Sequence, residues 1–260
     1  MANAPATVDL NCDLGESFGR YTLGLDEQII PLVSSANIAC GMHAGDPLVM
    51  AQTVRRAVEA SVALGAHPGY PDLQGFGRRD LTLSPREVYA FVLYQMGALS
   101  AFAQANGTLL HHVKPHGQLY NRAAVDRDCA VAIARAVYDF DPALVLVGLA
   151  QSELVRAGEA HGLAVAHEFF ADRGYTDEGR LVPRSQPGAL IASEDEAVAR
   201  TVRAVTEGVV CTVGGATIAV TADTVCVHGD GPQALAFAER LRLGLEEAGI
   251  AIRPVGSHGA

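Results

Sequence analysis

Histidine side chains gather at the ends of apolar runs in this sequence. Seven of the nine histidines fall at or near such ends, where a strand would stop and a loop begin. A single histidine there is more often a structural residue than a ligand or a base. Because parallel strands place their carboxyl ends on one face, seven of them favour a shared site. His111 and His112 point to opposite faces of a strand, so at least one of these two is expected to serve packing. The seven histidines are His43, His67, His111, His112, His116, His167 and His228.

Lys114 is the single lysine among 19 basic residues, the other 18 being arginine. A codon preference for arginine explains the scarcity of lysine but not the position of this one, between His112 and His116. An ammonium group there is suited to pair with a carboxylate or to stabilise a developing oxyanion. We expect Lys114→Met to reduce turnover severely with little change in stability. The chain also lacks a G-x-x-x-x-G-K-[ST] sequence, so it has no Walker A phosphate loop.

Carboxylates follow the same apolar runs, and they are harder to interpret. Asp46 and Asp230 each stand next to a proline that opens a helix, so a capping role is as well supported as a functional one. Asp13 and Glu168 have no such structural explanation. Mixed histidine and carboxylate ligands suit zinc, manganese or iron, but no H-x-x-x-H or H-E-x-x-H spacing is present. A metal at Asp13, His43 and His67 is therefore left as an open alternative.

Strand-like and helix-like segments alternate along the chain, which predicts parallel strands joined by crossover helices. Continuous apolar strands such as 144–147 indicate burial on both faces, as in a closed barrel. Segments 209–213 and 217–221 flank Gly214-Gly215 and predict a small β-hairpin addition. The seven strands predicted from periodicity are 7–11, 36–40, 61–67, 109–114, 144–149, 164–169 and 224–228.

Capping residues, prolines and glycines indicate where the helices begin and end. Capping boxes are predicted at 84–87 and 193–196, and Asp46-Pro47 and Gly231-Pro232 place proline at a first helical position. Three segments exceed ordinary loop length and predict site-forming loops, namely 13–24, 68–83 and 171–191. Helices are expected to stop at Gly107, Gly162, Gly208 and Gly249.

Composition restricts the class of protein. With 260 residues and 49% hydrophobic content, a single α/β domain spanning 1–260 is expected. The net charge of -10 and the absence of long basic clusters argue against a nucleic-acid groove, so small molecules or proteins are the expected partners. The absence of a leader sequence and of any long apolar stretch predicts a cytoplasmic protein without membrane association. Five cysteines without C-x-x-C spacing indicate reduced core residues.

Six ordered blocks of sequence span nearly the whole chain. They are V-D-L-N-C-D-L-G-E (8–16), A-N-I-A-C-G-M-H-A-G-D-P (36–47), G-A-H-P-G-Y-P-D (65–72), V-K-P-H-G-Q-L-Y-N (113–121), E-F-F-A-D-R-G-Y (168–175) and V-H-G-D (227–230). Together they resemble the LamB/YcsF family, which includes the A subunit of the prokaryotic ATP-dependent 5-oxoprolinase. One departure is Met42, where the family pattern leads us to expect an aromatic residue.

The resemblance implies both a fold and a reaction. The fold is an irregular seven-stranded parallel (β/α) barrel similar to the deacetylase and glycoside hydrolase barrels, in agreement with the seven strands counted independently. The reaction is the opening of 5-oxo-L-proline to L-glutamate with hydrolysis of ATP, together with partner subunits B and C. Since a lactam is a stable amide, we expect the partners to activate it with ATP and this chain to direct water onto the activated carbon.

Residue roles follow from that division of labour. Asp13, His67 or Glu168 is the expected general base, Lys114 and His116 stabilise the oxyanion, and Arg173 holds the substrate carboxylate by a two-pronged contact. Two alternatives remain, a metal-dependent deacetylase-like amidohydrolase acting alone and a non-catalytic substrate-binding subunit. The other expected substrate-binding residues are Asn11, Glu16, Asn37, His43, Asp46, Asp172 and His228. Asp13, His43, His67, Lys114, His116 and Glu168 are expected to converge on one concave pocket.

Overall fold

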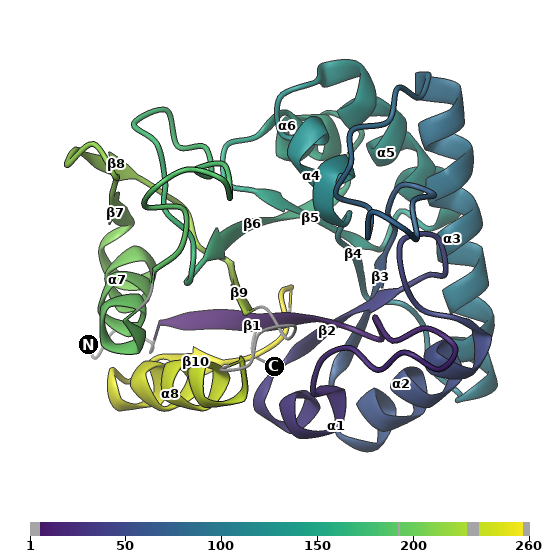
Figure 1. Ribbon diagram of the computed structural model, residues 1–260, viewed down its shortest axis with the longest axis horizontal. Coiled ribbons are helices and arrows are strands. Elements are labelled where there is room, and N and C mark those ends of the chain that lie inside the picture. The colour runs from purple at the N-terminus through teal and green to yellow at the C-terminus, as the bar shows by residue number, and fades with distance from the viewer. Residues whose placement is uncertain (1–5, 192, 228–233, 257–260) are drawn as a thin grey trace.

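The computed structural model describes residues 6–191, 193–227 and 234–256. Within them, seven strands form a closed parallel barrel in the order β1-β2-β3-β4-β5-β6-β9, with β9 pairing back to β1 (Figure 1). A short eighth strand, β10, pairs in parallel with Thr7 and Val8 of β1. The strands of this sheet are β1 (Thr7–Leu14), β2 (Ser35–Ala39), β3 (Ala63–His67), β4 (His112–Val113), β5 (Val145–Leu149), β6 (Ala164–Phe170), β9 (Thr224–Val227) and β10 (Ala251–Ile252).

Helices surround the barrel on its outside (Figure 1). The longest, α3, buries Val88, Val92, Met96 and Leu99, whose spacing of three to four residues forms one apolar stripe. Within the described chain, α3 alone is long and apolar enough to cross a membrane, and this buried stripe is typical of a core helix. The helices are α1 (Asp26–Ile29), η1 (Ile30–Leu32), α2 (Pro47–Glu59), α3 (Pro85–Ala105), α4 (Gly117–Ala123), α5 (Arg127–Phe140), α6 (Glu153–Ala160), α7 (Glu194–Glu207) and α8 (Ala234–Glu247).

Most predicted helix signals are confirmed by hydrogen bonds. Ser84 and Glu87 form a reciprocal capping box at α3, and the Ser193 side chain accepts from the Glu196 N–H at α7. Asp46 caps α2, which begins at Pro47. The predicted start at Gly231-Pro232 lies outside the described residues. Positive φ angles of 74°, 81°, 68° and 74° occur at the predicted stops Gly107, Gly162, Gly208 and Gly249.

Several strand bounds differ from the sequence prediction, and β3, for example, begins at Ala63 rather than at Ser61. β1 continues to Leu14, so Asp13 lies inside the strand rather than after it. β4 is reduced to His112–Val113, although the His111 backbone still bonds to Leu64 and Val145 on either side. β10 was not predicted, since two residues are too short to show an alternating pattern.

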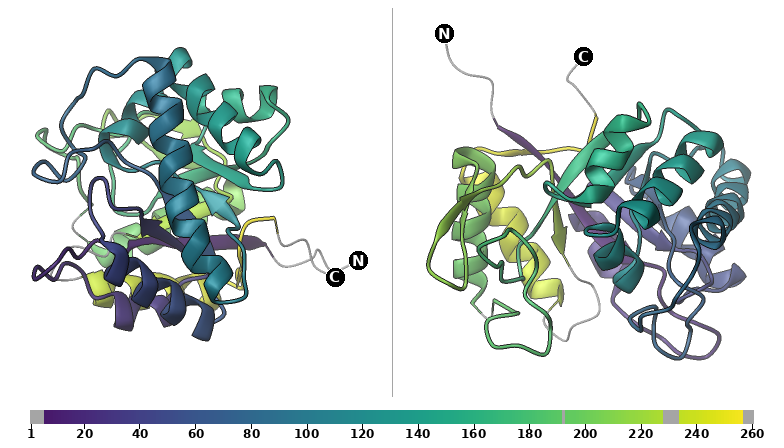
Figure 2. Two further views of the ribbon diagram at one scale, coloured as in Figure 1. Left: turned by 90° about the vertical axis from the view of Figure 1, so that its right-hand side faces the viewer. Right: turned by 90° about the horizontal axis from the view of Figure 1, so that it is seen from above.

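The predicted hairpin is confirmed, and it supports a site-forming loop. β7 (Val209–Cys211) and β8 (Thr217–Ala219) pair antiparallel outside the barrel (Figure 1). The Val213 N–H donates to the Tyr175 carbonyl oxygen at 2.9 Å, which fastens loop 171–191 to the hairpin. Figure 2 shows the loops that follow β1, β3 and β6, coloured purple, blue and green, at the same end of the barrel. The segments predicted to form the site therefore lie together.

Candidate active site

The interior of the barrel is polar along β1. Alternate residues of a strand share one face, and Asp9, Asn11 and Asp13 all point inward. The Asp9 carboxylate accepts hydrogen bonds from Ser34 Oγ at 2.6 Å and from Ser35 Oγ at 2.7 Å. Burial raises the pKa of Asp9 to about 6, although these hydroxyl donors oppose the shift. A row of polar side chains, Asp9, Asn11 and Asp13, therefore runs through the barrel interior toward the carboxyl ends of the strands.

Lys114 is buried next to Asp13, at the end of this row that lies nearest the carboxyl ends of the strands. Its Nζ lies 2.9 Å from Asp13 Oδ1 and 2.7 Å from Glu168 Oε1, and it donates to Asn11 Oδ1 at 3.1 Å. It also lies 3.1 Å from Cys226 Sγ. Burial disfavours the charge, yet Asp13, Cys226 and Glu168 together raise the pKa of Lys114 well above its usual value. The ammonium group is therefore charged inside the barrel.

Asn37 fixes the orientation of the groups around Lys114. Its Nδ2 donates to Asn11 Oδ1 at 2.7 Å and to Asp13 Oδ1 at 2.9 Å. Its Oδ1 lies 2.8 Å from His112 Nε2, which must therefore be the donor. Burial first, and then the charges of His111 and Lys114, lower the pKa of His112, so its ring is neutral. The sequence placed Asn11 and Asn37 among substrate-binding residues, and the structure places them in the network behind Asp13.

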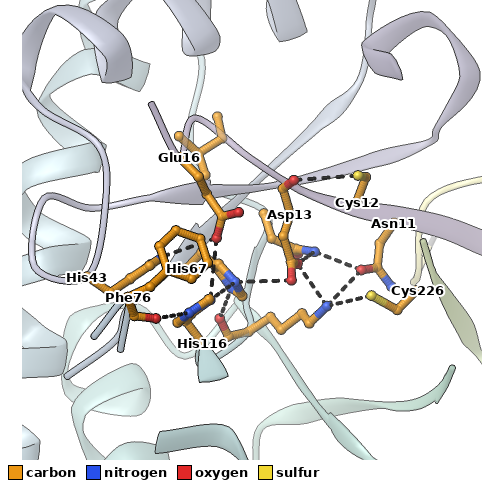
Figure 3. Close-up of polar contacts among 12 residues, drawn as sticks. Asn11, Cys12, Asp13, Glu16, His43, His67, Phe76, His116 and Cys226 are labelled. Atoms are coloured by element: carbon orange, nitrogen blue, oxygen red, sulfur yellow. Dashed lines mark hydrogen bonds and ion pairs between the residues drawn. The ribbon is translucent and has the colours of Figure 1, made fainter. Parts of the chain in front are cut away.

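Two imidazoles, His67 and His116, meet at their nitrogen atoms beside Asp13, with their ring planes nearly perpendicular (Figure 3). His67 Nδ1 lies 2.7 Å from the Lys114 carbonyl oxygen, and His116 Nε2 lies 2.8 Å from the Phe76 carbonyl oxygen. Since a carbonyl oxygen can only accept, both of these nitrogens carry hydrogen. The remaining nitrogens, His67 Nε2 and His116 Nδ1, are 3.0 Å apart. Two neutral rings would meet there lone pair to lone pair, so a proton or a metal ion is required between them.

Glu16 and His43 complete the cluster. Glu16 Oε1 lies 3.4 Å from His116 Nδ1 and 3.3 Å from His43 Nε2, while Asp13 Oδ2 lies 3.3 Å from His67 Nε2. The His43 and His116 rings are stacked with centroids 3.7 Å apart. Burial, followed by the charges of the neighbouring histidines, lowers the pKa of both rings well below the usual value. Protonation of the cluster is therefore costly.

The donor set satisfies the requirements of a divalent metal. One ligand atom from each of Glu16, His43, His67 and His116 lies within 4.8 Å of all the others. Tetrahedral zinc with bonds of about 2.0–2.1 Å places its ligands roughly 3.3 Å apart. His116 Nδ1 lies at similar distances from His67 Nε2, 3.0 Å, and from Glu16 Oε1, 3.4 Å. The stacked His43 ring is the poorer ligand, because parallel rings direct their lone pairs side by side. Its Nδ1 is buried without a hydrogen-bond partner among the described residues.

A cavity of about 630 Å³ opens above this cluster. Asp13, His67, Lys114 and His116 line it, as expected from the strand ends. His43 and Glu168 are buried behind them, against Glu16 and Lys114. The lining also contains Glu16, Arg78, Pro115, Gly117, Gln118, Tyr120, Asn121, Ala124, Val125, Leu149, Phe170, Arg173, Arg180, Leu181, Pro183, Arg184 and Ser185.

Other predicted substrate-binding residues lie differently. Asp46 caps α2 and also accepts from the Gly19 N–H at 2.7 Å, and it is not among the lining residues. Arg173 lines the cavity, but its Nε and Nη2 donate to the carbonyl oxygens of Ala189 and Val182. Two of its three guanidinium nitrogens are therefore engaged by the loop, which disfavours the expected two-pronged contact with a substrate carboxylate. Asp172 is half-buried at the base of the same loop, and His228 lies outside the described residues.

Loop 68–83 was predicted to form the site, but its role in holding the histidines was not foreseen. Gly77 has a φ of 63°, and a Cβ there would lie 2.8 Å from His43 Cβ and 2.9 Å from His116 Cδ2. Glycine therefore lets the backbone close over both rings. The loop is held by an ion pair between Asp72 and Arg79, whose Nε lies 2.9 Å from Asp72 Oδ1. Loop length was the only sequence signal for this role.

The family model of the LamB/YcsF family matches residues 8–259. The chain belongs to the LamB/YcsF family. A LamB/YcsF relative from Geobacillus thermodenitrificans, named as the A subunit of 5-oxoprolinase, is 59% identical over 247 residues, which cover 95% of this chain and 96% of the relative. The crystal structure of the lactam utilization protein from Thermus thermophilus is 52% identical, with a TM-score of 0.91, and the match covers 95% of this chain and 99% of that one.

More distant structures share the fold of this LamB/YcsF chain. The T48 deacetylase has a TM-score of 0.50 at 14% identity, over 96% of this chain and 89% of its own. Identity this low shows the fold alone. The expected deacetylase-like seven-stranded barrel is therefore confirmed.

Proposed function

We propose that this LamB/YcsF chain is the hydrolytic subunit of an ATP-dependent 5-oxoprolinase that opens 5-oxo-L-proline to L-glutamate. The names of its relatives support a lactam as substrate and a complex of several subunits. The observation that carries the proposal is the pairing of Lys114 with Asp13 at the cavity floor, with Nζ 2.9 Å from Oδ1. One supplies a fixed positive charge and the other a carboxylate, the two groups that addition of water to an amide requires.

Hydrolysis of a lactam requires three chemical events that the chain must assist. A water oxygen adds to the amide carbon while a base takes its proton, negative charge grows on the amide oxygen, and the C–N bond breaks as the ring nitrogen gains a proton. Asp13 is the favoured base, because Glu168 is buried behind Lys114. Lys114 stabilises the oxyanion. A proton held between His67 Nε2 and His116 Nδ1 is placed to protonate the leaving nitrogen.

ATP enters this scheme through the partners, which we take to be subunits B and C. The chain has no Walker A loop, and a five-membered lactam is too stable for ready hydrolysis by a lone carboxylate. If the partners activate the lactam with ATP, this chain needs no phosphate loop of its own, and the amide that reaches it is easier to hydrolyse. The proposed compartment is the cytoplasm, where ATP is plentiful.

A divalent metal is the alternative occupant of the position between His67 Nε2 and His116 Nδ1, and it would replace the proton held there. Glu16, His67 and His116 would hold it, with His43 packed against them. When bound, such an ion polarises a carbonyl oxygen or lowers the pKa of a bound water. The wild-type chain should be stabilised against heat by added Zn²⁺ or Mn²⁺, and Glu16→Gln should lose most of that shift. Equal shifts of the melting temperature in both proteins would mean that the metal does not bind at Glu16, and that a proton lies between the two histidine nitrogens instead.

Glutamate formation from 5-oxoproline, measured with and without ATP and the partner subunits, tests the main proposal. The isolated chain should neither hydrolyse ATP nor open the lactam, and the complete mixture should do both. Conversion by the isolated chain without ATP would instead establish the deacetylase-like amidohydrolase acting alone.

Asp13→Asn separates catalysis from mere binding. Loss of a general base lowers turnover by roughly 10²–10⁴. Asp195→Asn, on the exposed surface of α7, is the matched control and should leave turnover unchanged. Full activity of Asp13→Asn, with normal complex assembly, would favour the non-catalytic substrate-binding subunit.

A further inference from the structure

Gln95 is a fully buried polar side chain on the inner face of α3, the helix that lies outside the barrel beside β3 (Figure 1). A buried amide costs free energy unless its donors and its acceptor are hydrogen-bonded. Gln95 Oε1 accepts from the Gly69 N–H at 2.9 Å. Its Nε2 donates to the carbonyl oxygens of Gly69 at 2.9 Å and Phe91 at 3.0 Å. One side chain therefore satisfies both main-chain polar groups of Gly69.

Gly69 lies two residues beyond the end of β3, where regular strand pairing has stopped. β3 ends at His67, and the Pro68 carbonyl oxygen accepts from the His116 N–H at 2.9 Å. Among the described residues, no main-chain group bonds to Gly69 in the same way. Gln95 therefore takes the place of a neighbouring strand, and it fixes the chain to α3 at this point.

The segment 67–69 contacts all three clustered imidazoles. Its first residue is one of these histidines, and its second holds the main chain of His116. A Cβ at Gly69 would lie 2.6 Å from His43 Nδ1, so the main chain is closed against that ring. The His43 ring in turn stacks on His116 with centroids 3.7 Å apart. A shift of Gly69 would therefore move His43 relative to the rest of the cluster.

We propose that Gln95 is a positioning residue for the histidine cluster. It holds both polar groups of Gly69, and Gly69 in turn sets the place of the His43 ring beside His67 and His116. The inference rests on the proposed function for the importance of this spacing to turnover. The contacts alone carry the claim that Gln95 sets the spacing.

The surroundings of Gly69 explain why an amide is needed at position 95. Without it, the N–H and the carbonyl oxygen of Gly69 are left unsatisfied in the protein interior, which favours movement toward another polar group. His43 Nδ1 is such a group, since it is buried against Gly69 and has no hydrogen-bond partner among the described residues. Gln95 therefore keeps Gly69 from bonding to His43, whose other nitrogen, Nε2, lies 3.3 Å from Glu16 Oε1.

The first test compares Gln95→Leu with Leu99→Ala in the complete complex, at a temperature where both chains are folded. Both changes lie in the buried stripe of α3, and only the first releases Gly69. Because a displacement of about 1 Å can cost 10²-fold in rate, Gln95→Leu should lower kcat about 10–100-fold with little change in KM. Leu99→Ala should lower the melting temperature and keep kcat near the wild-type value. Equal kcat in the two variants would overturn the proposal.

Gln95→Glu separates hydrogen bonding from packing. A neutral carboxyl group can donate to the Gly69 carbonyl oxygen and accept from its N–H as the amide does, whereas a carboxylate can only accept. Burial favours the neutral form. Gln95→Glu should therefore keep most of the wild-type kcat at about pH 6 and lose it, relative to wild type at the same pH, toward about pH 9. A variant as slow as Gln95→Leu at every pH would overturn the proposal.

The third test needs no reaction, so it remains informative if the wild-type complex forms no glutamate and the proposed function fails. Ring NMR signals of the isolated chain, with isotopically labelled histidine and a chelator present, are assigned by replacing each histidine in turn. The signals of the three clustered histidines should shift in Gln95→Leu and stay in place in Leu99→Ala. His161, at the end of α6, is the internal reference. Unchanged cluster signals in Gln95→Leu would overturn the proposal.

Discussion

Lys114 combines a chemical role with a structural one. Its ammonium group is buried and balances Asp13 and Glu168 at 2.9 Å and 2.7 Å. Removing one partner of a buried ion pair costs about 3–5 kcal/mol, because the remaining charge is left without compensation. The sequence alone led us to expect little effect of Lys114→Met on stability. The buried carboxylates revise that expectation.

Lys114→Met should therefore lower both turnover and stability. Loss of one oxyanion-stabilising donor reduces kcat by roughly 10²–10³. The free energy of unfolding, measured with urea, should fall, and the added change Glu168→Gln should recover part of it without restoring turnover. Near-normal turnover in Lys114→Met would leave codon preference as the explanation of its position.

At the residue scale, the sequence predicted which side chains meet and not how they meet. Strand ends converge in any parallel barrel, so Asp13, His67 and Lys114 could be grouped from periodicity. The facing nitrogens of His67 and His116 depend on carbonyl oxygens of Lys114 and Phe76, whose directions follow from tertiary packing. No pattern of residue types contains that information.

Loop 171–191 shows how one element is positioned by another. Arg200 Nη1 donates to the carbonyl oxygens of Ala171 and Arg173 at 3.1 Å and 2.7 Å, which holds the base of the loop. At the tip, the Thr212 hydroxyl beside the β7–β8 hairpin donates to Asp177. The hairpin therefore acts as a support that keeps Arg180 over the cavity.

Deletion of the tip, residues 177–180, should lower the activity of the complex more than it lowers the melting temperature. It removes Arg180 from the cavity lining but no residue of the barrel. Thr206→Val is the control, since it removes a hydrogen bond of about 0.5–1.5 kcal/mol within α7 and none of those that hold Arg180. A tip deletion that melts much earlier yet retains activity would mean that the loop is purely structural.

Elements were easier to predict from the sequence than the paths of loops. Strands buried on both faces and explicit capping residues such as Ser84 and Asp46 are local signals. The route of Arg180 to the cavity depends on contacts with Thr212 and Val213, more than 30 residues along the chain. Of the arginines of the cavity, Arg173 was predicted, and Arg78, Arg180 and Arg184 were missed although the two loops that carry them were singled out by length.

For the molecule as a whole, the buried histidines predict lower stability in acid. Burial lowers the pKa of His43, His112 and His116 in the folded chain, whereas the unfolded chain protonates them near pH 6.5. Below that pH the unfolded state binds more protons, so stability falls as pH decreases. Asp9 opposes this trend, because its pKa is raised to about 6 and the folded state binds its proton first.

Burial also lowers the pKa of His111 and raises the pKa of Asp26, so four histidines stand against two aspartates and the balance is still a net loss. The urea midpoint should therefore decrease from about pH 7 to about pH 5. A chelator should be present, because a bound metal would add a pH dependence of its own. A flat or rising midpoint would show that these rings are not neutral in the folded chain.

Closure of the barrel between β1 and β9 has a consequence for synthesis on the ribosome. Asp9 of β1 pairs in register with Thr224 of β9. The first strand to be synthesised therefore cannot complete its pairing until β9 has been synthesised. At about 5–20 residues per second, that wait is on the order of ten seconds or more. During it, the edge of β1 is unpaired, and inward-pointing polar residues are a known protection against edge-to-edge aggregation.

The polar row of β1 therefore protects the nascent chain as well as lining the finished barrel. A chain stopped after residue 223, without β9, should stay soluble longer with Asp9 and Asn11 intact than with leucine at both positions. Sedimentation after cell-free synthesis would measure the difference, and equal losses would remove this role. The strand whose partner is synthesised last would then also carry the residues that keep it soluble until that partner arrives.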